Sequence, residues 1–97
     1  MPLQDTLQAV ADPVRREILR MLKQSSMTAG EISASFPITD AAVSRHLSVL
    51  RRAGLVTAER EGRFIRYSIT TSVLEDALCF LMELRREPDA STEKSSS

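Results

Sequence analysis

The stretch from Thr39 to Gly54 constrains the fold most, because it carries a helix start, a helix stop and an amphipathic pattern between them. The Thr39 hydroxyl can cap the free backbone N–H groups of a first turn, and Gly54 can take the left-handed conformation that ends a helix. Val43, Leu47 and Leu50 recur at spacings of four and three, which places them on one face. This stretch is therefore predicted to be a single amphipathic helix.

The opposite face of the predicted helix carries small and basic side chains. Ala41, Arg45, Ser48 and Arg52 follow one another along that face, with Ser44 beside them. Small residues allow close approach to another surface, and Ser and Arg can hydrogen-bond to base edges and phosphates. The face indicates DNA recognition, although an ordinary helix with a solvated polar face shows the same pattern.

The residues before this helix predict further helices. Thr28 and Glu31 form a capping box, and Pro37 ends the short helix that the box begins. Two short helices joined by a tight turn form the helix-turn-helix pattern, which ordinary helical bundles also contain. Farther upstream, Asp12–Pro13 is typical of the start of another helix.

Beyond the predicted recognition helix, the periodicity changes to that of strands. Residues 55–60 and 63–69 are rich in β-forming side chains and are separated by Glu61–Gly62, a hairpin turn signal. The hairpin carries three arginines near its tip and outer side, namely Arg60, Arg63 and Arg66. A basic hairpin after a recognition helix predicts a wing that contacts the adjacent minor groove or backbone. The alternative is a solvated hairpin whose charges prevent edge pairing.

Residues 72–86 predict a final helix that is apolar around most of its circumference. Because one small domain cannot cover such a helix on every side, we expect it to pack, together with a first helix, against the same helices of a second copy. Two-fold symmetry also matches a palindromic DNA site. The alternative is a monomer with an exposed apolar patch. The residues predicted at the dimer interface are Leu3, Leu7, Val10, Leu74, Ala77, Leu78 and Leu81.

Length and composition limit the chain to one modest domain. Its 97 residues support a single core, predicted over residues 1–87, followed by a polar, Ser-rich tail at 88–97 that we expect to be disordered. No apolar run approaches the length of a membrane span, so we expect a cytoplasmic protein. One cysteine, one histidine and the lack of a Gly-rich phosphate loop argue against an enzyme.

The formal net charge is zero, but the charges are unevenly distributed along the chain. Residues 37–68 carry six arginines and three acidic residues, a net charge of +3, whereas residues 69–97 carry three cations and six acidic residues, a net charge of −3. The forked guanidinium of arginine suits phosphate and guanine. The basic middle segment therefore favours nucleic-acid binding of moderate, salt-sensitive affinity.

Four runs occur in order along the chain: ADPVRREILRML, MTAGEI, TDAAVSRHLSVLRRAGLV and EGRFIRYSI. Over roughly residues 5–85 they resemble the ArsR-type bacterial winged-helix repressors, and the first two runs resemble the SdpR-like autorepressor subgroup. The resemblance implies a mainly α (α+β) winged helix-turn-helix, ordered α-α-α-α-β-β-α with a two-stranded wing. It also implies a homodimer that binds double-stranded operator DNA in the bacterial nucleoid and represses transcription, often of its own operon.

The resemblance places the DNA contacts at the start of the recognition helix and on the wing. The implied contacts are Thr39, Ala41, Ala42, Ser44, Arg45, His46, Ser48, Arg52, Arg63 and Arg66. Arg45 is expected to read a base, and Thr39 and Ser44 are expected to bind phosphates. Because His46 lies beside the apolar face, its role stays open between a structural hydrogen bond and a DNA contact.

Family members that sense metals use Cys pairs in the helix before the recognition helix, or His, Asp and Glu on the final helix. Here the first segment reads AGEISASF, without Cys, and the second reads SVLEDALCFLMELRR, without His. Since soft metals need several thiolates or imidazoles, the sequence predicts neither a metal nor a cofactor. Two alternatives stay open: a thiol- or metal-responsive sensor that uses Cys79, and a winged-helix protein-interaction module.

Overall fold

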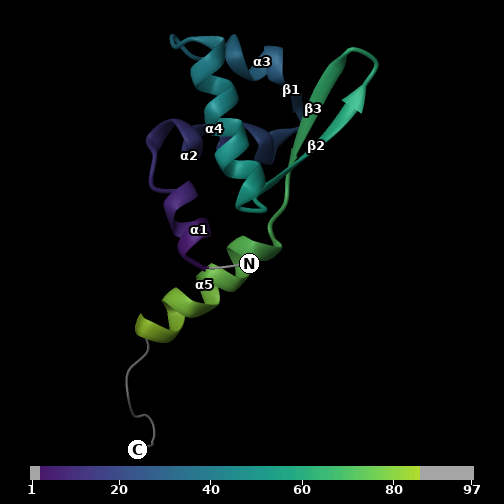
Figure 1. Cartoon of the computed structure of the whole chain (residues 1–97). Coiled ribbons are helices and arrows are strands. Elements are labelled where there is room, and N and C mark those ends of the chain that lie inside the picture. Colours follow the sequence, from purple (N-terminus) through teal and green to yellow (C-terminus); the bar gives the residue numbers. More distant parts are fainter. Residues whose placement is uncertain (1–2, 86–97) are drawn as a thin grey trace, which may run out of the picture.

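The computed structural model describes residues 3–85, which form five helices and a small antiparallel sheet (Figure 1). In chain order the elements are α1 (Leu3–Ala9), α2 (Pro13–Gln24), β1 (Met27–Thr28), α3 (Ala29–Ser33), α4 (Asp40–Arg52), β2 (Val56–Glu61), β3 (Phe64–Ile69) and α5 (Ser72–Arg85). This mainly α, winged arrangement agrees with the predicted fold class. The predicted tail at 88–97 lies outside the described residues. Within the described range, no helix is long and apolar enough to cross a membrane.

Three predicted helix starts are present with their capping hydrogen bonds. Asp12 caps α2 by accepting from two amides of its first turn, at 2.9 and 3.1 Å. Thr28 and Glu31 form the reciprocal capping box of α3, in which each side chain accepts from the other residue's amide. Thr39 caps α4 by accepting from an amide of its first turn at 3.0 Å. These caps satisfy amides that lack a partner within the helix, so they fix where each helix begins.

Helix α3 is shorter than the sequence predicts, because it ends at Ser33 rather than near Pro37. The amides of Ser35 and Phe36 donate to carbonyls three residues earlier, at 3.0 and 3.3 Å. This is the tighter spacing of a 3₁₀ turn. Pro37 disfavours the α conformation at the residue before it, so the last turn tightens instead of continuing.

The sheet has three strands in the order β1-β3-β2, one more than the two-stranded wing expected from the sequence. Strand β1 pairs Met27 with Tyr67, and it is only two residues long, so it carries no alternating pattern. Strands β2 and β3 pair in register up to Glu61 opposite Phe64. The hairpin turn is therefore one residue later than predicted. Gly62, with φ +65°, occupies the first turn position and leaves Glu61 in the strand.

Helix α4 ends in a complete Schellman motif, which fixes the path from the helix into the wing. Gly54 has φ +79°, and its amide donates to the Arg51 carbonyl at 3.0 Å. The amide of Leu55 donates to the Leu50 carbonyl at 3.0 Å, and both leucines are fully buried. These two bonds satisfy carbonyls at the end of α4 and start the hairpin at a defined angle.

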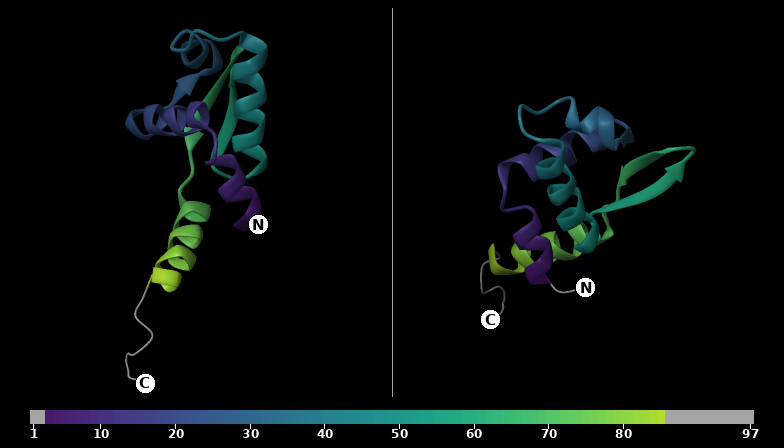
Figure 2. Two further views of the ribbon diagram at one scale, coloured as in Figure 1. Left: turned by 90° about the vertical axis from the view of Figure 1, so that its left-hand side faces the viewer. Right: turned by 45° about the horizontal axis from the view of Figure 1, so that its top comes forward.

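The core lies between α2, α3, α4 and the base of the sheet, and its largest fully buried side chains are Ile18, Ile32, Leu47, Leu50, Leu55 and Val43. Helix α5 extends away from this core, with α1 in contact with it (Figures 1 and 2). In α1 the buried residues are Thr6 and Ala9, and in α5 the buried residue is Ala77. The recognition helix and the wing are thus held by the core, whereas α5 is held mainly by α1.

Candidate nucleic-acid interface

Helix α4 presents the predicted two faces. Val43, Leu47 and Leu50 are buried in the core. The residues predicted to contact DNA include six that are exposed on or just before the helix, namely Thr39, Ala41, Ser44, Arg45, Ser48 and Arg52, and two that are half-buried, Ala42 and His46. The structure therefore leaves a polar face of small side chains, serines and arginines open to a partner, as the periodicity predicted.

The beginning of α4 is also fastened to α3 by a side-chain contact that the sequence pattern did not suggest. The Ser33 hydroxyl donates to the Asp40 carboxylate, which joins the end of one short helix to the first turn of the next. Asp40 also lies at the positive end of the α4 dipole, where a carboxylate is favoured. This contact orients the first turn of α4, the part expected to meet base edges.

His46 faces α2, and its imidazole belongs to a polar junction. The Arg15 guanidinium lies 3.1 Å from His46 Nδ1, and the Asp12 carboxylate lies 3.9 Å from the same nitrogen. The His46 side chain is 20% exposed. Of the two roles left open for His46, the structural hydrogen bond is present in the structure.

Arg15 was missed as a functional candidate, because the sequence pattern places it on the solvated face of α2. Besides His46, it donates to the Ala9 carbonyl at 2.7 Å and to the Gln8 carbonyl at 3.1 Å. Its three acceptors come from two other elements, and no local spacing signals such contacts. The next residue, Arg16, donates to the Val10 carbonyl at 2.8 Å.

The junction also sets the ionisation of Asp12. Partial burial raises the pKa of this carboxyl, but the amide hydrogen bonds from Arg15 and Val14 and the nearby His46 and Arg15 side chains outweigh that effect. The net result is a pKa below the usual value of 3.8. Asp12 is therefore charged at neutral pH and keeps its capping role.

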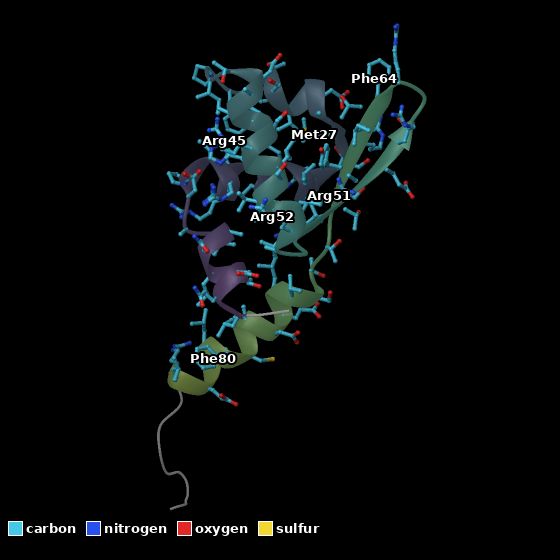
Figure 3. All side chains as sticks on the ribbon, in the orientation of Figure 1. Met27, Arg45, Arg51, Arg52, Phe64 and Phe80 are labelled. Atoms are coloured by element: carbon cyan, nitrogen blue, oxygen red, sulfur yellow. The ribbon has the colours of Figure 1, made fainter. Side chains whose placement is uncertain are left out.

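The wing separates its three arginines into different environments. Arg63 lies at the tip, with its guanidinium 5.8 Å from the centre of the Phe64 ring. Arg60, on β2, donates to the Gly62 carbonyl at 3.2 Å. Phe64 is 55% exposed at the tip (Figure 3), an aromatic that sequence reasoning left unassigned. The wing tip thus offers cations and one apolar ring to a partner.

Arg66 differs from the other two wing arginines, because it is engaged inside the chain. The register places Arg66 opposite Glu59, on the same face of the sheet as Glu61. Its Nε lies 3.0 Å from the Glu61 carboxylate, and its terminal nitrogen donates to the Ser26 carbonyl at 3.3 Å. Arg66 therefore joins the wing to the α2–β1 connection, and a DNA contact would compete with these bonds.

Arg52 lies apart from the start of the recognition helix. It lines an open cleft between α4 and α1 together with Asp5 and Arg15. Figure 3 shows Arg45 nearer the beginning of α4, and Arg52 near its end. Arg52 follows Arg45 by seven positions, about 10 Å along a helix. The predicted contact set therefore divides into one group near the start of α4 and one cation beside α1.

The surface of α5 is largely apolar and open. Leu78 and Leu81, both predicted at the dimer interface, are 57 and 46% exposed, and Leu84 is 68% exposed. Leu7 on α1, also predicted at that interface, is 38% exposed. Ala77, also predicted at that interface, is 5% exposed within the single chain, on the helix that α1 contacts. Cys79 is exposed on α5. Within residues 3–85, no three His, Cys, Asp or Glu side chains lie close enough together to hold a metal ion.

Residues 12–58 match the family described as bacterial regulatory protein, arsR family. The chain is 37% identical over 87 residues to the transcriptional repressor SdpR of Bacillus subtilis, across 90% of this chain and 97% of SdpR. It is 42% identical over 76 residues to the HTH-type transcriptional regulator CmtR of Mycobacterium bovis, across 78% of this chain and 64% of CmtR. The fold matches the crystal structure of an ArsR family transcriptional regulator with a TM-score of 0.81 and 25% identity, across 86% of each chain.

These matches confirm the family resemblance and the winged helix-turn-helix fold predicted from the sequence. The matched proteins are transcriptional regulators, which confirms that the chain is a regulator rather than an enzyme. The individual DNA contacts and the dimer-interface residues stay predictions.

Proposed function

Because the chain belongs to the ArsR family of bacterial regulatory proteins, we propose that it is a homodimeric repressor that binds a palindromic operator through α4 and the wing. This proposal rests mainly on the exposed face of α4, which carries Ser44, Arg45 and Ser48. The opposite, apolar face of the helix is buried in the core. Such a face enters a major groove, where arginine bonds to guanine and serine bonds to bases or phosphates.

In the proposed complex, the contacts near the start of α4 carry most of the sequence selectivity. Arg45 reads a base edge, while Thr39 and Ser44 bind phosphates and set the register of the helix in the groove. Arg63 at the exposed wing tip binds the backbone or the minor groove beside it. Arg66 supports the wing through Glu61 and Ser26, so its contribution to DNA binding is mainly indirect.

The homodimer is supported by the uncovered apolar surface of α5. Leu78, Leu81 and Leu84 recur every three residues along α5 and are all exposed, and exposed apolar patches of this kind mark protein interfaces. A second copy related by a two-fold axis would cover this surface and present two α4 helices to the same side of DNA. Half-sites about 34–36 Å apart, one turn of the duplex, are the expected arrangement.

We propose that release from DNA does not depend on a metal ion. The single cysteine lies on α5 and the single histidine lies on α4 against Arg15, so the chain does not gather the soft ligands that such sensors need. Addition of zinc or cadmium at stoichiometric concentration should leave the DNA-bound fraction in a gel-shift titration unchanged. Release by either metal would favour the alternative of a sensor built around Cys79.

The test of the proposed function is selection of duplexes from a random pool with the wild-type protein, followed by footprinting on its own promoter. Enrichment of an inverted repeat, and protection of the same repeat upstream of its own gene, are expected of a dimeric autoregulator. The affinity should fall steeply with salt, as phosphate contacts require. A protein-interaction module would enrich no sequence and give no site-specific retardation at moderate salt.

A further inference from the structure

Arg15 links α1, α2 and α4. In the proposed function, these three helices must keep a fixed orientation relative to one another. The Nε and one terminal nitrogen of Arg15 donate to the carbonyls of Ala9 and Gln8, at 2.7 and 3.1 Å. Its other terminal nitrogen lies 3.1 Å from Nδ1 of His46 on α4. Arg15 itself belongs to α2, so one guanidinium connects the end of α1, the start of α2 and the middle of α4.

These contacts of Arg15 with Gln8, Ala9 and His46, which we call the joint, are suited to holding the three helices rigidly. The carbonyls of Gln8 and Ala9 lie at the negative end of α1, where a cation is favoured, and the Gln8 carbonyl also accepts from the Ala11 amide at 3.2 Å. A guanidinium is planar and presents its donors in a fixed fork, so three acceptors in different directions hold it in one orientation. Asp12 completes the joint, because it caps the amides of α2 beside the same imidazole.

The contact also favours one tautomer of the His46 ring. Arginine has only donors, so a hydrogen bond from Arg15 requires Nδ1 as the acceptor. In the neutral ring this is the tautomer with its proton on Nε2. The joint thus depends on Nδ1 of His46. A substitution of His46 can place an amide near the position of Nδ1 or near that of Nε2.

We propose that Arg15 is a positioning residue that fixes the angle between α4 and the α1–α5 unit through His46 Nδ1, and thereby sets which half-site spacing the dimer accepts. This inference rests on the proposed function, in which α5 forms the dimer and α4 reads DNA. Helix α1 is seven residues long and buries only Thr6 and Ala9, so apolar packing alone gives it little resistance to rotation. A shift of about 3.4 Å between the two α4 helices corresponds to one base pair.

The experiment uses the inverted repeat enriched by the wild-type dimer, with its spacer lengthened or shortened by one base pair. The wild type should prefer the selected spacing by about tenfold, the scale of one mismatched base pair. Arg15→Lys keeps the charge but cannot span the three acceptors, and it should reduce that preference to about twofold. Arg16→Lys is the matched control, because Arg16 donates to the single carbonyl of Val10. It should keep the wild-type preference.

Two variants of His46 separate this role from a direct DNA contact and from simple stability. In His46→Asn the amide oxygen lies near the position of Nδ1, so Arg15 keeps an acceptor and the spacing preference should survive. In His46→Gln the amide lies near Nε2 instead, so the joint is lost and the preference should fall as in Arg15→Lys. If Arg15→Lys does not fold, the His46 pair carries the test.

Three results would overturn the inference. Equal loss of affinity on every spacer would mean that the joint supports stability alone. Retained preference in His46→Gln with loss in His46→Asn would show that Nε2 acts on DNA. Unchanged preference in Arg15→Lys and His46→Gln, both folded and dimeric, would remove the positioning role. Failure of the wild type to enrich any inverted repeat would instead contradict the proposed function.

Discussion

Arg45 and Arg66 show how the surroundings of one side-chain type decide what it does. Both arginines were predicted to contact DNA, and they share charge and length. Arg45 is exposed on the outer face of α4, whereas the Arg66 side chain is 33% exposed and bonds to Glu61 and Ser26. An arginine that already has a carboxylate partner gains less from a phosphate, because the new contact replaces an existing one.

Arg45→Ala should weaken specific binding by about 1–3 kcal/mol and relax selectivity at one base pair in each half-site. The loss follows from removal of a guanidinium that bonds to a base edge in the major groove. Affinities for the selected operator, for its single-base variants and for random DNA would measure it in gel-shift titrations. Arg51→Ala, which removes the same charge from the last turn of α4, is the control and should lower all three affinities about equally. Equal losses in Arg45→Ala would make Arg45 a phosphate contact instead.

Asp12 gives a prediction for stability against pH. Its pKa is lowered in the folded state, so its stabilising contribution is complete above the ordinary value of 3.8 and is lost as the pH falls through the folded pKa. Asp12→Asn keeps a side-chain acceptor for the α2 amides but cannot titrate. Urea unfolding at pH 7 and pH 3 should therefore show a smaller acid-induced loss in Asp12→Asn than in the wild type. An identical loss in both proteins would contradict this role.

Asp12→Ala, which lacks the cap, should be less stable at pH 7 by about 1 kcal/mol.

At the scale of the residue, the sequence predicts exposure better than partners. The helical period separated Val43, Leu47 and Leu50 from the outer face of α4, and the structure confirms that separation. The partners of Arg15 and Arg66 were not predictable, because they lie on elements distant in sequence. Neither a spacing nor a residue preference records such contacts until the chain is folded.

At the scale of the element, local signals were most informative where hydrogen bonds are local. The caps at Asp12, Thr28 and Thr39 were all predictable, because each side chain bonds within its own first turn. The additional strand at Met27 was not predictable, because its only evidence is pairing with β3 forty residues later. The hairpin turn was misplaced by one residue, because the pairing register decides which side of Gly62 belongs to the strand.

Gly54 lies between α4 and the wing, so its replacement tests whether the connection between them requires a left-handed residue. At φ +79°, a side chain adds strain to the backbone, although a Cβ there would meet the Val73 side chain only at an ordinary 3.5 Å. Gly54→Ala should lower stability by about 1 kcal/mol, with a melting temperature about 4–8 °C lower. Gly54→Asn, which tolerates the left-handed region better, should lose less. Equal melting temperatures for Gly54→Ala and the wild type would contradict a required left-handed turn. Calorimetry on the three proteins decides between these outcomes.

At the scale of the whole molecule, the predicted DNA contacts and the predicted dimer interface lie on different elements. Helix α4 and the wing carry the arginines predicted to contact DNA, whereas α5 exposes Leu78, Leu81 and Leu84. The sequence predicted this division from the excess of apolar residues in one helix, which needs no knowledge of the fold. It did not predict that α1 would bury Ala77 within the chain, because the angle between α1 and α5 depends on the connections at both helix ends.

The dimer can be tested by placing a charge in the centre of this apolar surface. Leu78→Glu should convert the protein to a monomer in sedimentation velocity, because a second copy would have to bury an unpaired carboxylate against leucines. Leu78 is 57% exposed in the single chain, so the substitution should leave the fold and the melting of the monomer nearly unchanged. Thr57→Glu adds the same charge to an exposed wing position and should stay dimeric. Operator affinity should fall in Leu78→Glu, because each half-site then binds separately and loses the advantage of linkage. A Leu78→Glu protein that sediments as an intact dimer would move the interface away from α5.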